Sequence, residues 1–241
     1  MIGRVLLAAL LAGIAAGLFM GVIQHVRITP LILEAEKYEH AGGHEHSHET
    51  APVQSTTESQ SAPVVEQAAE DEGWAPADGF ERTAYTTLAS VVAGAGFAAL
   101  LAGISILLGM RITPANGVLW GICGFLCVHL APAAGLAPEL PGMPAADLVM
   151  RQIWWVGTII ATAAAIALFA FRSEPWAKVA AVVLLLIPHV IGAPVPPTHE
   201  SGVPAGLAAE FAANTLAAAF LFWCAIGGLL GFTLDRFAQE R

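Results

Sequence analysis

Six long apolar stretches constrain the fold of this chain more than any other feature of its sequence. A helix needs about 20 consecutive apolar residues to cross the hydrocarbon core of a bilayer. Backbone groups in lipid must be paired within their own segment, and these runs lack the alternation typical of membrane β-strands. The sequence therefore predicts an all-α polytopic membrane protein, one transmembrane domain over residues 1–241, with about six spans at roughly 5–26, 84–109, 114–134, 152–171, 177–193 and 207–234.

The composition agrees with this class of protein. Hydrophobic residues make up 56% of the chain and charged residues 12%, about half of the roughly 25% charged residues typical of soluble domains. Most of the acidic residues lie between Glu34 and Glu81, so the net charge of −9 belongs mainly to one segment. The lipid bilayer is the expected environment, and the lack of a basic patch argues against nucleic acid as a partner.

The first apolar stretch begins like a secretory signal peptide. Arg4 precedes it, and residues 15–17 are small enough for a cleavage site. The apolar core of a signal peptide spans about 7–15 residues, however, whereas this run is uncharged from 5 to 26. We therefore expect an uncleaved membrane anchor, and cleavage would leave five spans.

The distribution of positive charge predicts the orientation, because cytoplasmic loops are richer in Lys and Arg near the membrane. The N-terminus is placed inside by this rule, which puts both termini in the cytoplasm and the long first loop on the outer side. The predicted inner set is Arg4, Arg111, Arg172, Lys178, Arg236 and Arg241, and the outer set is Arg27, Lys37, Arg82 and Arg151.

Three of the spans run into a histidine that lies close to a proline. These histidines are His25, His129 and His189, and each has small residues twelve and eight positions before it. With the N-terminus inside, all three lie at the outer ends of their spans. Polar residues in membrane spans are candidates for function, although a single histidine there can equally cap a helix or bond a neighbour.

The spacing after these histidines suggests an internal repeat. Fifteen residues separate His129 from Pro144, and fifteen separate His189 from Pro204, where each proline opens a Pro-Ala pair before the next span. The corresponding spacing in the first third is 51, and the excess of 36 matches the length of 40–75. We interpret the chain as three helix–loop–helix hairpins with one insertion, an arrangement in which transporters often place a ligand site between repeats.

Residues 40–75 have a different character from the rest of the chain. Low hydrophobicity with negative charge predicts a disordered insertion in the first outer loop. Imidazole groups suit divalent Co, Ni, Cu and Zn, so the tract could capture a metal ion weakly; a solvated polar loop is the alternative. Its histidines are His40, His44, His46 and His48.

The predicted metal site combines the three span histidines with outer carboxylates. Three imidazoles and neighbouring acids are a suitable ligand set for a divalent transition metal. Arg82 and Arg151 provide a second interpretation, since Glu81 and Asp147 close to them could form ion pairs at helix entrances. The candidate ligands besides the histidines already named are His199, Glu34, Glu36, Glu81, Glu139 and Asp147.

Other site types receive less support from the sequence. Cys123, Cys127 and Cys224 lie in apolar spans, where they either fill helix contacts or form a thiolate metal site. Neither a phosphate-binding loop nor a His-Glu-x-x-His pattern is present, and we predict that the chain is not an enzyme and carries no prosthetic group.

Four stretches carry a resemblance to a known family. They are VRITPLILEAE (26–36), WAPADGFER (74–82), PELPG (138–142) and PHVIGAP (188–194). These resemble the CbtA-type subunits of proposed bacterial cobalt transporters, and the similarity runs over essentially the whole chain. The resemblance implies a bacterial inner-membrane protein with a histidine-rich first loop, a small one-span CbtB-like partner and a link to cobalamin synthesis. The family is often described with five spans, whereas six are counted here.

Together these features predict a membrane subunit for uptake of cobalt(II). The outer tract would collect the ion and the ring of His25, His129 and His189 would pass it inwards. Imidazole and carboxylate ligands do not discriminate among Co, Ni and Zn, so a nickel or zinc transporter subunit is an alternative. A non-transporting metal sensor or scaffold is another, and homo-oligomers are compatible with each.

Overall fold

All regular secondary structure in the described part of the chain is helical. The computed structural model describes residues 2–42, 76–198 and 200–239. The elements are α1 (Ile2–Ile23), η1 (Gln24–Ile28), α2 (Thr29–Gly42), α3 (Phe80–Leu107), α4 (Gly117–Phe125), η2 (Leu126–Leu130), α5 (Ala131–Ala133), α6 (Leu148–Phe171), α7 (Pro175–Ile191) and α8 (Ala205–Gln239), where η1 and η2 are π-helical turns. The prediction of an all-α polytopic membrane protein is confirmed.

Four of the helices are long and apolar enough to cross a membrane. They cover Ile2–Tyr38, Phe80–Leu107, Leu148–Phe171 and Ala205–Gln239. The other two predicted spans form the shorter apolar helices Gly117–Ala133 and Pro175–Ile191. At about 1.5 Å per residue, a 17-residue helix reaches roughly 25 Å, which is less than the ~30 Å of a hydrocarbon core.

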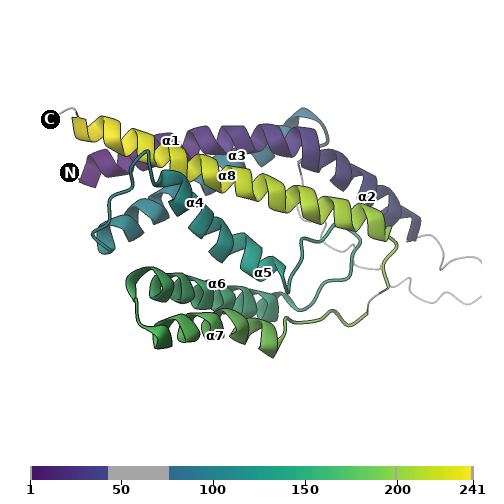
Figure 1. Ribbon diagram of the computed structural model, residues 1–241. Helices are drawn as coiled ribbons and strands as arrows, with labels where there is room; N and C mark the ends of the chain where they lie inside the picture. The colour runs from purple at the N-terminus through teal and green to yellow at the C-terminus, as the bar shows by residue number, and fades with distance from the viewer. Residues whose placement is uncertain (1, 43–75, 199, 240–241) are drawn as a thin grey trace, which may run out of the picture.

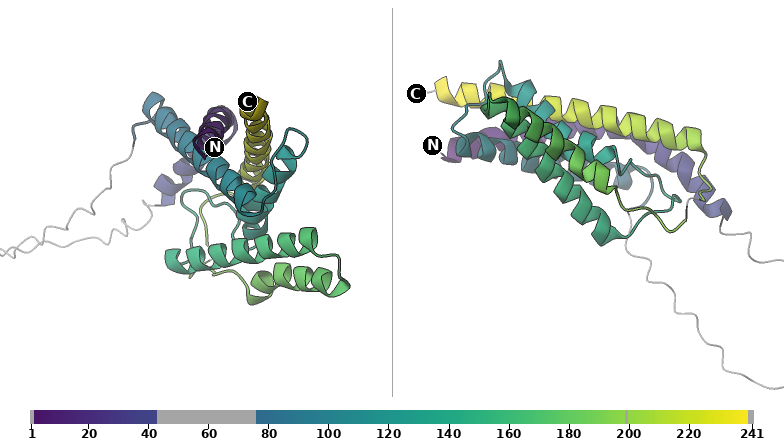
Figure 2. Two further views of the ribbon diagram at one scale, coloured as in Figure 1. Left: turned by 90° about the vertical axis from the view of Figure 1, so that its left-hand side faces the viewer. Right: turned by 60° about the horizontal axis from the view of Figure 1, so that its bottom comes forward.

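The helices run back and forth between two ends of the molecule (Figure 1). Both termini lie at one end, together with the short connections at 108–116 and 172–174. The connection at 134–147 and the described part of the connection before α8 lie at the opposite end, next to the start of α8 and the end of α2. Figure 2 shows α6 and α7 side by side as a separate layer against α1, α3, α4 and α8.

The helix pairing departs from the predicted three hairpins. The first hairpin forms, because α1 packs along α3. Helix α4, however, packs against α8, and α7 packs against α6. The second hairpin therefore meets mainly through η2 and α5, which contact α6, and α7 has α6 as its main neighbour in place of α8. Long connections join the helices of these two hairpins, at 134–147 and 192–204. Connections of this length allow each helix to pack against a helix that is not its neighbour in sequence.

Small residues explain which helix faces meet. Lipid tails are as apolar as the helix surfaces, so burial of apolar area does not drive helices together in a membrane. They associate instead where small side chains let the backbones approach closely. A Cβ atom on Gly13 would collide with the backbone of Gly94 and Ala95 in α3, and one on Gly117 would collide with the carbonyl of Gly227 in α8. The six small residues that precede the three histidines are all buried: Gly13, Gly17, Gly117, Gly121, Ala177 and Ala181.

Each of the two π-helical turns ends two residues before a proline. The amide of Thr29 donates to the carbonyl of Gln24, and Pro30 follows it. Proline has no amide hydrogen for the usual i→i−4 hydrogen bond, and its ring clashes with the carbonyl four residues earlier. A wider turn in front of the proline relieves this clash. Helix α2 is therefore continuous with the first span. It extends to Gly42, so residues 40–42 are helical, whereas the sequence placed them at the start of the disordered insertion.

Candidate functional site

His129 occupies the centre of the polar features inside the bundle. It lies in η2, and its Nδ1 accepts a hydrogen bond from the indole nitrogen of Trp223 across 3.0 Å. Trp223 is only 1% exposed and lies near the middle of α8. The ring of Phe125 stacks on the imidazole with 6.3 Å between centroids. Trp223 and Phe125 therefore hold His129 against α8, four residues before the end of the apolar helix Gly117–Ala133.

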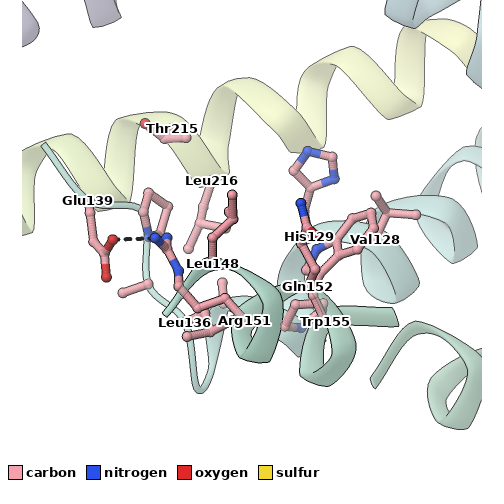
Figure 3. Close-up of a pocket in the computed structure, with 14 residues that line it drawn as sticks. Val128, His129, Leu136, Glu139, Leu148, Arg151, Gln152, Trp155, Thr215 and Leu216 are labelled. Carbon is pink, nitrogen blue, oxygen red and sulfur yellow. Dashed lines mark ion pairs between the residues drawn. The ribbon is translucent and has the colours of Figure 1, made fainter. Parts of the chain in front are cut away.

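One cavity extends from His129 towards the loop after α5. We name it the outer cavity for its place beside that loop. It has a volume of about 340 Å³ and is lined by η2, α5, the following loop, the start of α6 and the first half of α8. Figure 3 shows His129 at one end of this outer cavity and the Glu139–Arg151 ion pair at the other. The hydroxyl of Thr215 also lines the outer cavity, and it is buried with no hydrogen-bond partner among the described residues.

A second cavity begins on the other side of His129. We name it the inner cavity because helices of the main bundle surround it, and the name does not refer to a side of the membrane. It has a volume of about 390 Å³ and lies among α1, η1, α3, η2 and α8. Its polar lining comes from Gln24, Thr86 and Ser90, and the Gln24 amide nitrogen donates to the Ser90 hydroxyl across 3.3 Å. His129 is common to the linings of both cavities.

The other two span histidines have separate surroundings. His25 is exposed, and its Nδ1 lies 3.3 Å from the hydroxyl of Thr83. His189 packs edge-to-face against Trp154 with 5.9 Å between ring centroids. Within the described ranges, no three His, Cys, Asp or Glu side chains are close enough together to hold one metal ion. The predicted ring of three histidines is therefore not assembled in this structure.

The predicted outer acids take part in local contacts. Glu36 pairs with Arg82 across 2.7 Å, and Glu34 pairs with Lys37. Glu81 accepts a hydrogen bond from the backbone of Ala77 across 3.3 Å. Arg82 is thus paired with Glu36 and with Asp78, not with Glu81 as the ion-pair interpretation supposed.

Asp147 and Glu139 make different contacts at the start of α6. The carboxylate of Asp147 accepts from the amide of Met150 across 2.9 Å and so caps the N-terminus of α6. Arg151 pairs instead with Glu139 across 2.9 Å. Asp147 therefore acts as a helix cap in place of the ion-pair partner suggested by its sequence position.

Several predicted ligands cannot be placed. His44, His46, His48 and His199 lie outside the described residues, and the backbone of His40 belongs to α2 while its side chain is not described. The three cysteines are free and half-buried in α4, η2 and α8. They do not join a metal-binding group in the described parts of the chain, and their positions agree with helix packing.

Sequence reasoning missed the uncharged polar lining of both cavities. Gln24, Ser90 and Thr215 are uncharged, so they did not stand out beside the histidines and acids. Their positions could have revealed them. A polar side chain within an apolar span costs free energy unless it has a hydrogen-bond partner or a function. Trp223 was missed for another reason: its indole looks like an ordinary apolar residue until its donor group is seen against His129.

Comparison with known proteins identifies the family. No curated protein and no solved structure gave a significant match to the chain. A family model described as "Probable cobalt transporter subunit (CbtA)" matches residues 2–235, which is nearly the whole chain. With apolar helices that can span a membrane and a polar centre at His129, the chain belongs to the CbtA family of probable cobalt transporter subunits.

Proposed function

We propose that this chain forms the membrane path for Co²⁺ and that His129 is its central ligand. The observation that supports this most directly is that His129 lines both cavities, so an ion that moved from one to the other would pass its imidazole. The other half-buried span histidine, His189, lines neither of them. Imidazole is a suitable ligand for divalent cobalt.

A path of this kind does not require a closed metal cage. Conduction needs sites that bind an ion well enough for entry and weakly enough for release. The outer cavity offers Glu139, Gln152 and Thr215, and the inner cavity offers Gln24, Thr86 and Ser90. A Co²⁺ ion would contact these side chains one after another, with water as its remaining ligands. Such an arrangement suits transport of the ion better than long-lived binding.

We place this path in a bacterial inner membrane, with uptake as the direction of transport. In this proposal both termini are cytoplasmic and the histidine-rich residues 40–48 lie on the outer side, where they collect the ion. The arrangement of positive charges supports that orientation. The resemblance described above supports a small CbtB-like partner with one span and a supply of cobalt to cobalamin synthesis, and the transport role is not enzymatic.

Uptake of radiolabelled Co²⁺ by cells that express both subunits tests the proposal. We expect His129→Ala to lower uptake at least tenfold while the protein stays in the membrane. His189→Ala is the matched control, since His189 also contacts a tryptophan but lines neither cavity, and it should retain more than half of the uptake. Normal uptake by His129→Ala would contradict the proposal.

Competition by unlabelled ions measures selectivity in the same cells. Excess Co²⁺ should suppress labelled uptake more strongly than equal Ni²⁺ or Zn²⁺. If Ni²⁺ or Zn²⁺ competes better, the path serves that ion instead.

A further inference from the structure

The hydrogen bond between Trp223 and His129 determines the protonation form of the imidazole. An indole N–H is a donor only, so the Nδ1 atom of His129, 3.0 Å away, must accept with its lone pair. In a neutral imidazole the single proton is then on Nε2. A protonated imidazole would place an N–H against the indole N–H, so this contact admits only the neutral form.

A histidine in this form has no lone pair available for a cation. The Nδ1 lone pair faces the indole proton, and Nε2 carries a hydrogen. A metal ion binds to a neutral imidazole through a free ring nitrogen. His129 as it is held here is therefore a hydrogen-bond donor towards the cavities and not a ligand.

The indole itself is fixed more firmly than the imidazole. Trp223 is 1% exposed and packs against Phe97 with 4.7 Å between ring centroids. It lies over Gly124, where any side chain would overlap the indole ring. His129 is only half-buried, and cavities adjoin it on both sides. Release of the contact thus requires movement of the imidazole, for which there is room, and not of the indole.

We propose that Trp223 is a positioning residue that keeps His129 from binding cations until the imidazole leaves it. This inference rests on the proposed function, in which His129 is the central ligand. When the ring leaves the indole, Nδ1 becomes free to bind Co²⁺, or the proton moves from Nε2 to Nδ1 and Nε2 binds. In both cases the number of protons on the ring is unchanged. Because Trp223 competes for the imidazole, Co²⁺ stays bound to His129 only briefly, as transport requires.

Trp223→Phe isolates the role of the donor, because it keeps an aromatic ring against Phe97 but removes the N–H. Trp154→Phe is the matched control. Its indole donates to the carbonyl of Pro188 across 3.1 Å while its ring contacts His189, so it removes an N–H without changing the partner of His129. Both variants would be made in the full-length protein in lipid nanodiscs.

The first measurement is the tautomer of His129 without metal, from nitrogen chemical shifts of labelled histidine assigned with His129→Gln. The wild type and Trp154→Phe should show the Nε2–H form, and Trp223→Phe should show a mixture with Nδ1–H. The second measurement is a Co²⁺ titration followed by paramagnetic broadening of the His129 signal. Loss of one neutral hydrogen bond should lower the midpoint in Trp223→Phe roughly three- to tenfold.

The outcomes separate the two proposals. An unchanged tautomer in Trp223→Phe, or a changed tautomer with an unchanged midpoint, overturns the role of Trp223 while leaving His129 as a ligand. A His129 signal that never responds to Co²⁺ in any variant overturns the assignment of His129 and with it this inference. A changed tautomer with a lower midpoint in Trp223→Phe alone supports both.

Discussion

The guanidinium of Arg82 pairs with the carboxylate of Glu36 across 2.7 Å and so joins the start of α3 to α2. Arg151 and Glu139 form the same kind of contact at the start of α6, across 2.9 Å. Each glutamate follows the histidine of its span by ten or eleven residues, and each arginine follows the proline of its Pro-Ala pair by six or seven. These similar spacings relate the first and second thirds of the chain. In the last third Glu210 stands at the position of the arginine.

The pair of Glu36 and Arg82 should stabilise the protein measurably. Both side chains are about three-quarters buried, so Glu36→Gln leaves a partly buried cation whose remaining ion-pair partner in the described ranges is the exposed Asp78. We expect the free energy of unfolding to fall by about 1–3 kcal/mol, measured by thermal unfolding in detergent. Glu34→Gln is the control, because the Glu34–Lys37 pair is exposed and should contribute about 0–1 kcal/mol. Equal losses in both variants would contradict this prediction.

Asp147 should behave as a helix cap. Asp147→Ala removes the acceptor for the amide of Met150 and should cost about 1 kcal/mol of stability. Asp147→Asn keeps a side-chain oxygen at that place, so both its unfolding and its Co²⁺ uptake should match the wild type. A stable Asp147→Asn protein that fails to take up Co²⁺ would show instead that the carboxylate serves as a ligand.

Glycines such as Gly117 in α4 and Gly227 in α8 allow the close contact between these two helices. Gly117→Ala places a methyl group against the carbonyl of Gly227, so the helices must separate, at a cost of about 1–3 kcal/mol. Gly96→Ala is a suitable control, because nothing lies within 4 Å of a Cβ atom built there. Unfolding by a denaturing detergent compares the two. A Gly117→Ala protein as stable as the Gly96→Ala control would show that the close approach is not needed.

The inner cavity should need its polar lining for transport. Gln24→Leu keeps a similar volume and removes the hydrogen bond to Ser90, so stability should change by no more than about 1.5 kcal/mol. Uptake of Co²⁺ should nevertheless fall several-fold, because the ion would face an apolar wall. Met20→Leu, an apolar change in the lining of the same cavity, is the control and should transport normally. Similar uptake by both variants would argue against passage through this cavity.

The histidine-rich segment should affect the capture of Co²⁺ and not the path itself. Ligands tethered near an entrance raise the local ion concentration without new contacts inside. Deletion of 43–75 should therefore raise the Co²⁺ concentration for half-maximal uptake several-fold and leave the maximal rate intact. Replacing His44, His46 and His48 with Asn in the full-length chain should reproduce the effect. A lower maximal rate at an unchanged half-maximal concentration would contradict this role.

The positions of the helices could be predicted from local sequence. Expected spans at 84–109 and 152–171 correspond to helices at Phe80–Leu107 and Leu148–Phe171. The buried glycines Gly13 and Gly117 could be predicted too, because their spacing from the histidines marks one face of a helix. The helix that packs on that face could not be predicted. Gly13 packs on α3, the next span along the chain, whereas Gly117 packs on α8, the last span.

The sequence by itself determined the class of protein, the positions of its helices and the residue types available to a divalent metal. These follow from the transfer of apolar segments into lipid and from the chemistry of imidazole, and neither depends on distant parts of the chain. Only the tertiary structure decided that α4 packs on α8. That pairing brings Trp223 to His129 and leaves His25 and His189 with other neighbours. Contacts between spans depend on how helices rotate and pair in space, and hydropathy carries no information about either.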